Sequence, residues 1–237
     1  MKPTTPIHQL KHRARLMARR ETIPLHEALD RVARAEGFPR WSLLSARHAA
    51  GTPLTALLPR LADGDLLLLG ARPGQGKTLL GLQLLLDAAR AGRGAFFFTL
   101  EYSSREARQR IRSLDRSEGG WGDKLEIVAS DAICADFIIG HLSGAPRGTV
   151  AIIDYLQILD QQRSKPALAD QVRALRDFAT ETGIVLGFIS QIDRRFDPAQ
   201  KPLPDITDIR LPNPVGMHHF TKACFLHDGD ISLQTIA

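Results

Sequence analysis

Residues 65–90 read DLLLLGARPGQGKTLLGLQLLLDAAR, and this stretch decides the fold. The continuous apolar run Leu66–Leu69 is typical of a strand that is buried on both faces. GARPGQGKT follows at 70–78, and the leucine-rich segment after it has the composition of a buried helix. A glycine-rich turn between a buried strand and a helix is the context that a phosphate-binding loop requires. The stretch therefore predicts a nucleotide-binding α/β domain.

The residue types in this turn match the chemistry of phosphate binding. The pattern [AG]-x4-G-K-[ST] is satisfied with Ala71 in first position. Glycines let backbone N–H groups close around phosphate oxygens, and the helix N-terminus adds its partial positive charge. We expect Lys77 to reach the β- and γ-phosphates and the Thr78 hydroxyl to ligate Mg²⁺. The predicted nucleotide-binding residues are Ala71, Arg72, Pro73, Gly74, Gln75, Gly76, Lys77, Thr78 and Leu79.

Beyond this stretch, short apolar runs alternate with helical segments. The runs lie at 65–70, 94–100, 125–129, 149–154 and 183–190, with two less regular strands expected at 222–226 and 231–236. Helices are expected at about 78–91, 104–114, 132–142 and 167–182. This βαβ succession predicts a mostly parallel sheet with helices on both faces. Residues 191–221 hold five of the 14 prolines and are expected to form a long irregular loop.

Three polar residues follow apolar runs of the expected sheet. Asp154 ends TVAIID, where its carboxylate can hold the water shell of Mg²⁺. Glu101 comes directly after GAFFFTL and can orient and deprotonate an attacking water, although an exposed charge at a strand end is an alternative. Gln191 in FISQIDRR can sense the γ-phosphate and transmit its presence to the adjoining loop, or be an ordinary polar residue at a strand end.

The charge of the chain is unevenly divided. The net charge is +5, but residues 1–60 carry 11 Lys and Arg against 4 Asp and Glu, a net +7. Residues 61–237 carry 20 against 22, a net −2. The spacing of Ile7, Leu10, Ala14 and Met17, with Pro24 further on, predicts two or three helices in the first 50 residues. They are either a surface for an anionic partner or a solvated, arginine-rich helical face.

The composition also excludes several classes of protein. No apolar run approaches the ~20 residues of a bilayer span, and the N-terminus lacks a secretory apolar region, so no membrane association is expected. Cys134 and Cys224 form no CxxC motif, which argues against a disulfide framework or a structural zinc site. A cytoplasmic location is expected. The predicted organisation is a basic helical appendage at 1–50, a linker at 51–62 and the nucleotide-binding domain at 63–237.

Taken together, GARPGQGKT, FFFTLEYS, VAIIDYLQIL and FISQIDRR resemble the RecA-like ATPase domain of DnaB-type replicative helicases. The resemblance covers about residues 60–210. It extends to Arg72–Pro73, to the sequence DYLQ at 154–157 and to DITDIR at 205–210, which go beyond a generic ATPase motif. It implies a RecA-like fold with ATP and Mg²⁺ as cofactors.

The resemblance also assigns roles to individual residues. Lys77 and Thr78 would bind the nucleotide phosphates and the metal, and Asp154 would support the metal. Glu101 would be the catalytic base and Gln191 the sensor. Members of the family work as hexameric rings on single-stranded DNA with each nucleotide between two subunits. A homo-oligomer and a single-stranded DNA partner are therefore expected.

Two basic segments are candidates for DNA contact. The loop QQRSKP at 161–166 contains Arg163 and Lys165. The proline-rich region contributes four further candidates: Arg194, Arg195, Lys201 and Arg210. Neither segment has an aromatic platform for base stacking, so contacts would be mainly to phosphates and strongly salt-dependent.

The chain departs from the family pattern in two places. The family has a late K-x-R motif on a strand, whereas the corresponding region here reads HDGDISLQTIA, with no Lys or Arg after Lys222. Residues 1–50 do not resemble the family's N-terminal primase-interacting domain. Two functions remain open: an ATPase acting on single-stranded DNA as a helicase or translocase, or a nucleotide-gated RecA/KaiC-like binding or regulatory module. In the module, hydrolysis would be slow and the N-terminal helices would recruit an unidentified partner.

Overall fold

The computed structural model describes residues 7–41, 44, 57–114, 121–160, 165–198, 200–210, 215–228 and 230–236. The chain divides into two compact units, one of residues 1–55 with 228–230 and the other of residues 56–227 with 231–237. Within these described residues, no helix is both long enough and apolar enough to cross a bilayer.

The first unit contains the helices α1 (Ile7–Glu21) and α2 (Leu25–Ala35). They pack through a small core in which Leu10 and Ala14 meet Ala28 and Val32, all fully or almost fully buried. α2 begins after Pro24, as its sequence predicted. The third helix expected in this region falls largely outside the described residues.

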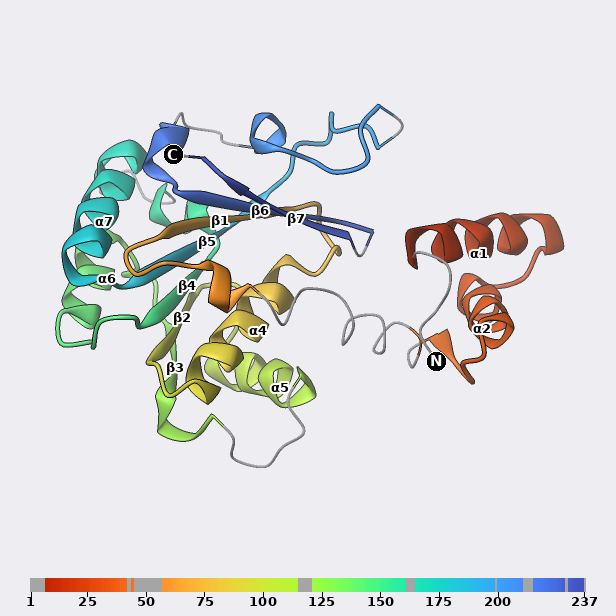
Figure 1. Cartoon of the computed structure of the whole chain (residues 1–237), viewed down its shortest axis with the longest axis horizontal. Coiled ribbons are helices and arrows are strands. Elements are labelled where there is room, and N and C mark those ends of the chain that lie inside the picture. Colours follow the sequence, from red (N-terminus) through yellow and green to blue (C-terminus); the bar gives the residue numbers. More distant parts are fainter. Residues whose placement is uncertain are drawn as a thin grey trace. The chain divides into compact units, whose positions relative to one another are not determined.

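The second unit is built on a seven-stranded sheet of order β3-β2-β4-β5-β1-β6-β7 (Figure 1). The bounds are β1 (Leu66–Ala71), β2 (Ala95–Thr99), β3 (Leu125–Ala129), β4 (Val150–Asp154), β5 (Val185–Gln191), β6 (Lys222–His227) and β7 (Asp230–Thr235). The strands β1 to β6 pair in parallel, and β7 lies beside β6 at the edge. The mostly parallel sheet that the apolar runs predicted is confirmed.

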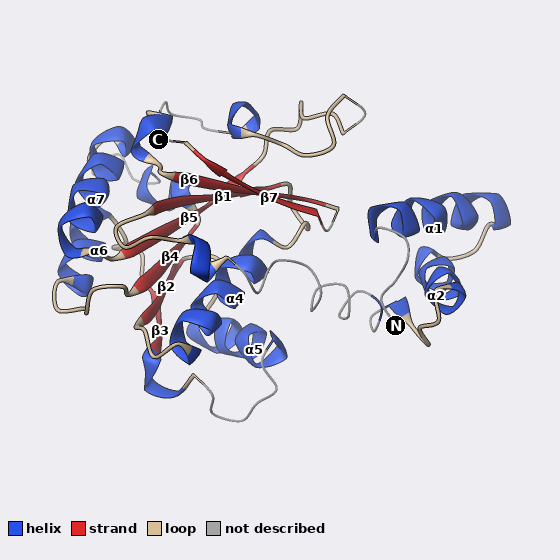
Figure 2. Cartoon of the chain, in the orientation of Figure 1, coloured by secondary structure: helices blue, strands red, loops and turns tan. Residues whose placement is uncertain are grey.

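Helices cover both faces of this sheet (Figure 2). α4 (Lys77–Arg90) and α5 (Ser104–Leu114) lie on one face, and α6 (Ala135–Leu142) and α7 (Leu168–Thr182) lie on the other. β1 serves both sides: Leu66 and Leu68 belong to the core under α6 and α7, whereas Leu69 faces α4. A Cβ at Gly81 of α4 would lie 3.1 Å from Ile152 of β4, so this helix rests directly on the sheet.

Short 3-10 helices occupy several connections: Leu58–Arg60, Gly122–Lys124, Leu156–Asp160, Ile206–Asp208 and Met217–His219. Two of them lie in the proline-rich region after β5, which has no long helix or strand among its described residues. An isolated antiparallel bridge joins Ile192 to Ile209 and closes the base of this region. We call residues 192–210 the proline loop.

Candidate nucleotide-binding site

The phosphate loop connects the end of β1 to the start of α4. Gly74 and Gly76 have φ angles of 78° and 90°, a left-handed conformation that L side chains rarely adopt. A Cβ built on either glycine would meet no atom within 4 Å, so the space above the loop is open. The first bond of the helix runs from Leu80 N to Gly76 O at 2.9 Å. The N–H groups of the first turn therefore face this space, which suits an anion.

The predicted nucleotide-binding residues differ in exposure along the loop. Ala71 is buried as the last residue of β1, and Pro73 and Gly74 are exposed. Lys77 is half-buried at the start of α4, whereas the Leu79 side chain is 40% exposed. Only the backbone of Leu79 is therefore suited to contact a phosphate.

Thr78 and Asp154 meet at the carboxyl-terminal ends of the parallel strands. The Thr78 hydroxyl donates a hydrogen bond of 3.0 Å to Asp154 Oδ2, and the Asp154 carboxylate is fully buried. The other oxygen, Oδ1, is buried and has no hydrogen-bond partner among the described residues. A hydroxyl beside a carboxylate with one unused oxygen matches the ligands that Mg²⁺ prefers. The pair thus fits the predicted metal site.

Burial and a neighbouring charge raise the pKa of Asp154 to about 6. The larger cause is desolvation, and the negative charge of Glu101 adds to it. The hydrogen bond from Thr78 and the positive charge of Lys77 act in the opposite direction. A divalent cation at this position would favour the ionised carboxylate.

A metal here needs ligands beyond the protein. Among the described residues, no group of three His, Cys, Asp or Glu side chains is placed to hold a metal ion. Mg²⁺ is commonly held by one or two protein groups together with nucleotide phosphates and water. Thr78 and Asp154 therefore suit an ion that arrives with a nucleotide.

Glu101 follows β2 beside Asp154. The register pairs Thr99 of β2 with Asp154 of β4, and the Glu101 N–H donates a 3.1 Å bond to the Thr99 hydroxyl. The Glu101 side chain is exposed, yet its charge acts on Asp154. Its assignment as the catalytic base stays a prediction, which this position supports.

Gln191 ends β5 in register with Ala71 of the phosphate loop strand. Its carbonyl oxygen accepts a 2.8 Å hydrogen bond from Arg210 N, at the base of the proline loop. The residue therefore adjoins both the phosphate loop and the proline loop. The role of γ-phosphate sensor stays a prediction.

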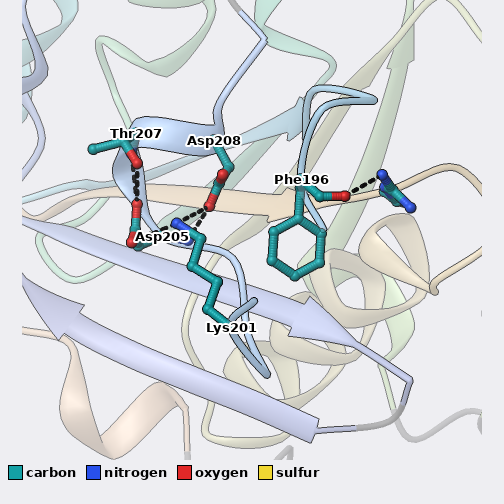
Figure 3. A network of polar contacts seen from close by, with 6 residues as sticks. Phe196, Lys201, Asp205, Thr207 and Asp208 are labelled. Atoms are coloured by element: carbon teal, nitrogen blue, oxygen red, sulfur yellow. Dashed lines mark hydrogen bonds and ion pairs between the residues drawn. The ribbon is translucent and has the colours of Figure 1, made fainter. Parts of the chain in front are cut away.

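The candidate DNA contacts fall into two groups. Lys165 Nζ donates to the carbonyl oxygens of Asp131 and Ile133 at 3.3 and 2.8 Å, and Lys201 Nζ lies 2.7 Å from Asp205 and 2.6 Å from Asp208 (Figure 3). These contacts favour structural roles for both lysines. The side chains of Arg194, Arg195 and Arg210 are exposed around the base of the proline loop. Arg163 lies outside the described residues.

Two residues have contacts that the sequence did not predict. The Arg72 guanidinium, expected at the nucleotide, donates hydrogen bonds to the carbonyl oxygens of Arg194 and Phe196. Gln157 Nε2 donates a 3.0 Å bond to Arg210 O. Both side chains follow strand ends and reach the proline loop. The only sequence signal for them was their place in the motifs, which does not name the acceptor.

The strand order and the glycine-rich loop after β1 together define a P-loop domain with the RecA-like fold. One solved structure, described as an ATPase domain, has the same fold with a TM-score of 0.56 at 20% identity, over 70% of both chains. A DnaB-like replicative helicase gives 0.55 at 20% identity, over 70% of this chain and 48% of that one. The KaiC-like protein PH0186 of Pyrococcus horikoshii gives 0.51 at 17% identity, over 68% of this chain and 70% of the other.

Sequence comparison finds relatives that are named as replicative DNA helicases. The probable plasmid replicative DNA helicase of Chlamydia muridarum is 28% identical over 182 residues, which are 63% of this chain and 40% of that protein. The replicative DNA helicase DnaB of Mycoplasma pneumoniae is 24% identical over 196 residues, 67% of this chain and 41% of that protein. No protein-family model matches the chain. Over these stretches the chain, which spans about two fifths of these relatives, is similar to replicative DNA helicases.

Proposed function

We propose that this chain binds ATP with Mg²⁺, hydrolyses it and acts on single-stranded DNA as a helicase or translocase motor. The observation that carries the proposal is the bond between Thr78 and Asp154 behind the open glycine loop, with Asp154 Oδ1 unused by the described residues. A metal would neutralise phosphate charge there. The loop amides and Lys77 would bind the phosphates and hold the γ-phosphate for in-line attack.

Two further residues would act on the attacking water and on the product. Glu101 would accept the proton of the water, because its carboxylate is exposed beside the metal pair. Gln191 would donate its side-chain amide to the γ-phosphate and lose that contact on hydrolysis. Its carbonyl, bonded to Arg210, links the change to the proline loop.

The DNA and the assembly are supported by charge and by relatives. Arg194, Arg195 and Arg210 are exposed cations at one loop base, and they suit the phosphates of a single strand. The curated relatives are named as replicative helicases. We therefore propose a homo-oligomer, with a hexamer as the expected ring, that works on DNA in the cytoplasm.

The experiment compares the wild type with Lys77→Ala and Glu101→Gln. Lys77→Ala is expected to lose binding of a fluorescent ATP analogue. Glu101→Gln is expected to keep that binding and to lose about 10²–10⁴-fold in turnover. Oligo-dT should raise wild-type turnover. Arg108→Gln, an exposed change on α5, is the charge-matched control. Wild-type turnover in Lys77→Ala would refute the proposal.

A second candidate function is a nucleotide-gated module that recruits an anionic partner through α1. Lys11, Arg15 and Arg19 are spaced four residues apart, about 6 Å along one helix face. They form no ion pair with any residue that the structure describes, whereas Arg13, Arg20 and Arg31 pair with glutamates. We call these three residues, Lys11, Arg15 and Arg19, the α1 stripe. Slow wild-type turnover without DNA stimulation would favour this module.

A further inference from the structure

We infer that Arg72 is a positioning residue that ties the phosphate loop to the proline loop, so that the bound nucleotide sets the placement of Arg194 and Arg195. The inference rests on the proposed function for its two ligands, a nucleoside triphosphate and the phosphate backbone of single-stranded DNA. It gives Arg72 a task different from phosphate binding.

The side-chain contacts of Arg72 are made with the proline loop. Its Nη2 donates to Arg194 O at 2.7 Å and also to Phe196 O, and the guanidinium carbon lies 5.5 Å from the centroid of the Phe196 ring. Phe196 is 4% exposed and stacks edge-on against His227 of β6. The guanidinium is therefore held on the first turn of the proline loop by two carbonyls and a ring.

The backbone of Arg72 belongs to the phosphate loop at the same time. Gln75 N donates to Arg72 O at 3.2 Å, which forms the turn that leads to Gly76. Ile192 N donates to Ala71 O at 3.1 Å, so the two loops also begin side by side. A shift of the phosphate loop around a nucleotide would consequently pull on residues 194–196.

The proline loop is closed and can move as a unit. Arg210 N bonds to Gln191 O at 2.8 Å, and Asp193 N bonds to Asp208 O at 2.7 Å. Lys201 joins the two carboxylates Asp205 and Asp208 inside the loop (Figure 3). A displacement at residues 194–196 is therefore passed to the whole loop rather than absorbed by local bending.

The exposed side chains of Arg194 and Arg195, next to the contacts of Arg72, are the part of the loop that would bind DNA phosphates. Arg194 supplies the carbonyl that Arg72 binds, and Arg195 follows it with an exposed side chain. Cations on a loop can bind phosphates of a nucleic acid with an affinity that depends on where the loop holds them. Coupling of this kind is reciprocal, so DNA would change nucleotide affinity by the factor with which nucleotide changes DNA affinity.

The test uses the full chain with Arg72→Gln, Arg72→Lys and the control Arg108→Gln. The dissociation constant of a labelled oligo-dT is measured with a non-hydrolysable ATP analogue and with ADP. We take the ratio as the larger of the two oligo-dT dissociation constants divided by the smaller. In Arg72→Gln, this ratio is expected to fall toward one, at least about fivefold below that of the wild type. Affinity for the ATP analogue should stay within about threefold, because the phosphates lose no ligand. Arg108→Gln should keep both values.

Arg72→Lys separates geometry from charge. A lysine keeps the positive charge, but its side chain is one atom shorter and lacks the planar guanidinium that lies over the Phe196 ring, so Arg72→Lys should lose the ratio as Arg72→Gln does. A wild-type ratio in Arg72→Lys would overturn the inference. A loss of ATP-analogue affinity above about tenfold in Arg72→Gln would overturn it too, because Arg72 would then be a phosphate ligand.

Hydrogen exchange tests the link without DNA. Amides of residues 193–208 are expected to exchange at least about fivefold faster in Arg72→Gln than in the wild type, while those of β4 stay unchanged. Equal exchange would overturn the inference. If the wild type binds no oligo-dT but exchange rises as expected, the proposed function fails and the structural link stands. Phe196→Leu, which removes the ring from the other side, should raise exchange in the same amides.

Discussion

Asp154 is the residue whose chemistry depends most on its surroundings. It is fully buried, bonded to Thr78 through one oxygen, and faced by the negative charge of Glu101. Without a metal, the folded chain therefore holds this carboxylate at a cost in stability. That cost is consistent with a site built for a cation.

The cost makes the stability of the metal-free chain depend on pH. The pKa of Asp154 is raised from 3.8 to about 6, so the unfolded state releases this proton first as the pH rises. The penalty is absent below pH 3.8 and fully present above pH 6. As the pH rises between these limits, the free energy of unfolding of Asp154→Asn should therefore increase by about 3 kcal/mol relative to that of the wild type. Urea unfolding in chelator measures it, and a constant difference would contradict the prediction.

The sequence predicted that Thr78 and Asp154 lie together, but not the contacts of Lys201 and Arg72. Thr78 and Asp154 each belong to a motif with a known place at the sheet edge, so their meeting could be predicted. The partners of Lys201 and Arg72 could not, because both lie in or against a long loop without periodicity. Lys201 was assigned to DNA by its charge alone, and its two carboxylate partners became visible only with the loop folded.

At the scale of elements, the proline loop combines irregular backbone with many internal bonds. Asp205 and Asp208 cap the turn 206–208 reciprocally, and Lys201 joins both. The hydrogen bond from Lys201 is the main reason that the pKa of Asp205 is lowered to about 2. Asp205 and Lys201 therefore stay ionised across the physiological pH range.

Lys201→Gln and Asp208→Asn test whether this cluster is structural. They change the loop charge in opposite directions, yet each removes a bond that holds the turn. Both are expected to speed amide exchange at Thr207 and Asp208, by up to about tenfold. If only Lys201→Gln lowers oligo-dT affinity, and exchange is unchanged in both, Lys201 is a DNA contact instead. Exchange measured by mass spectrometry and binding by anisotropy decide between the outcomes.

Helix bounds show what sequence pattern can and cannot give. α4, α5 and α7 begin and end within about one residue of their predicted limits, since apolar periodicity and Gly183 mark them. α6 starts at Ala135 rather than near 132. Its first N–H is bonded to the buried Gln171 side chain of α7 at 2.9 Å. A helix start set by a distant side chain leaves no local signal.

At the scale of the molecule, the positive charge is concentrated in the first unit. The predicted boundaries at 1–50, 51–62 and 63–237 remain a prediction about organisation. What the structure adds is the α1 stripe, in which three cations are free of ion pairs with the described residues. The composition shows the excess positive charge. Only the ion pairs of the folded first unit distinguish the arginines that pair with glutamates from those of the α1 stripe.

The α1 stripe predicts a change in salt dependence. Replacing Lys11, Arg15 and Arg19 by Gln should lower the slope of log affinity for oligo-dT against log salt by about 2, at roughly 0.7 per phosphate contact. The matched control replaces Arg13, Arg20 and Arg31, which already pair with glutamates. Equal slopes in the two triple variants would show that only diffuse charge matters. Anisotropy titrations over a salt series provide the slopes.

The strand order has a consequence for how the chain is made. β1 lies between β5 and β6, with Leu66 opposite Leu186 and Leu67 opposite Lys222, so both partners of the strand that bears the phosphate loop are synthesised long after it. During translation, β2, β3 and β4 can assemble first, because β2 pairs with both β3 and β4 and all three are made before β5. The apolar strand β1, which bears the phosphate loop, therefore has two unpaired edges until β5 and β6 are made. In that interval the emerging chain depends most on protection from aggregation.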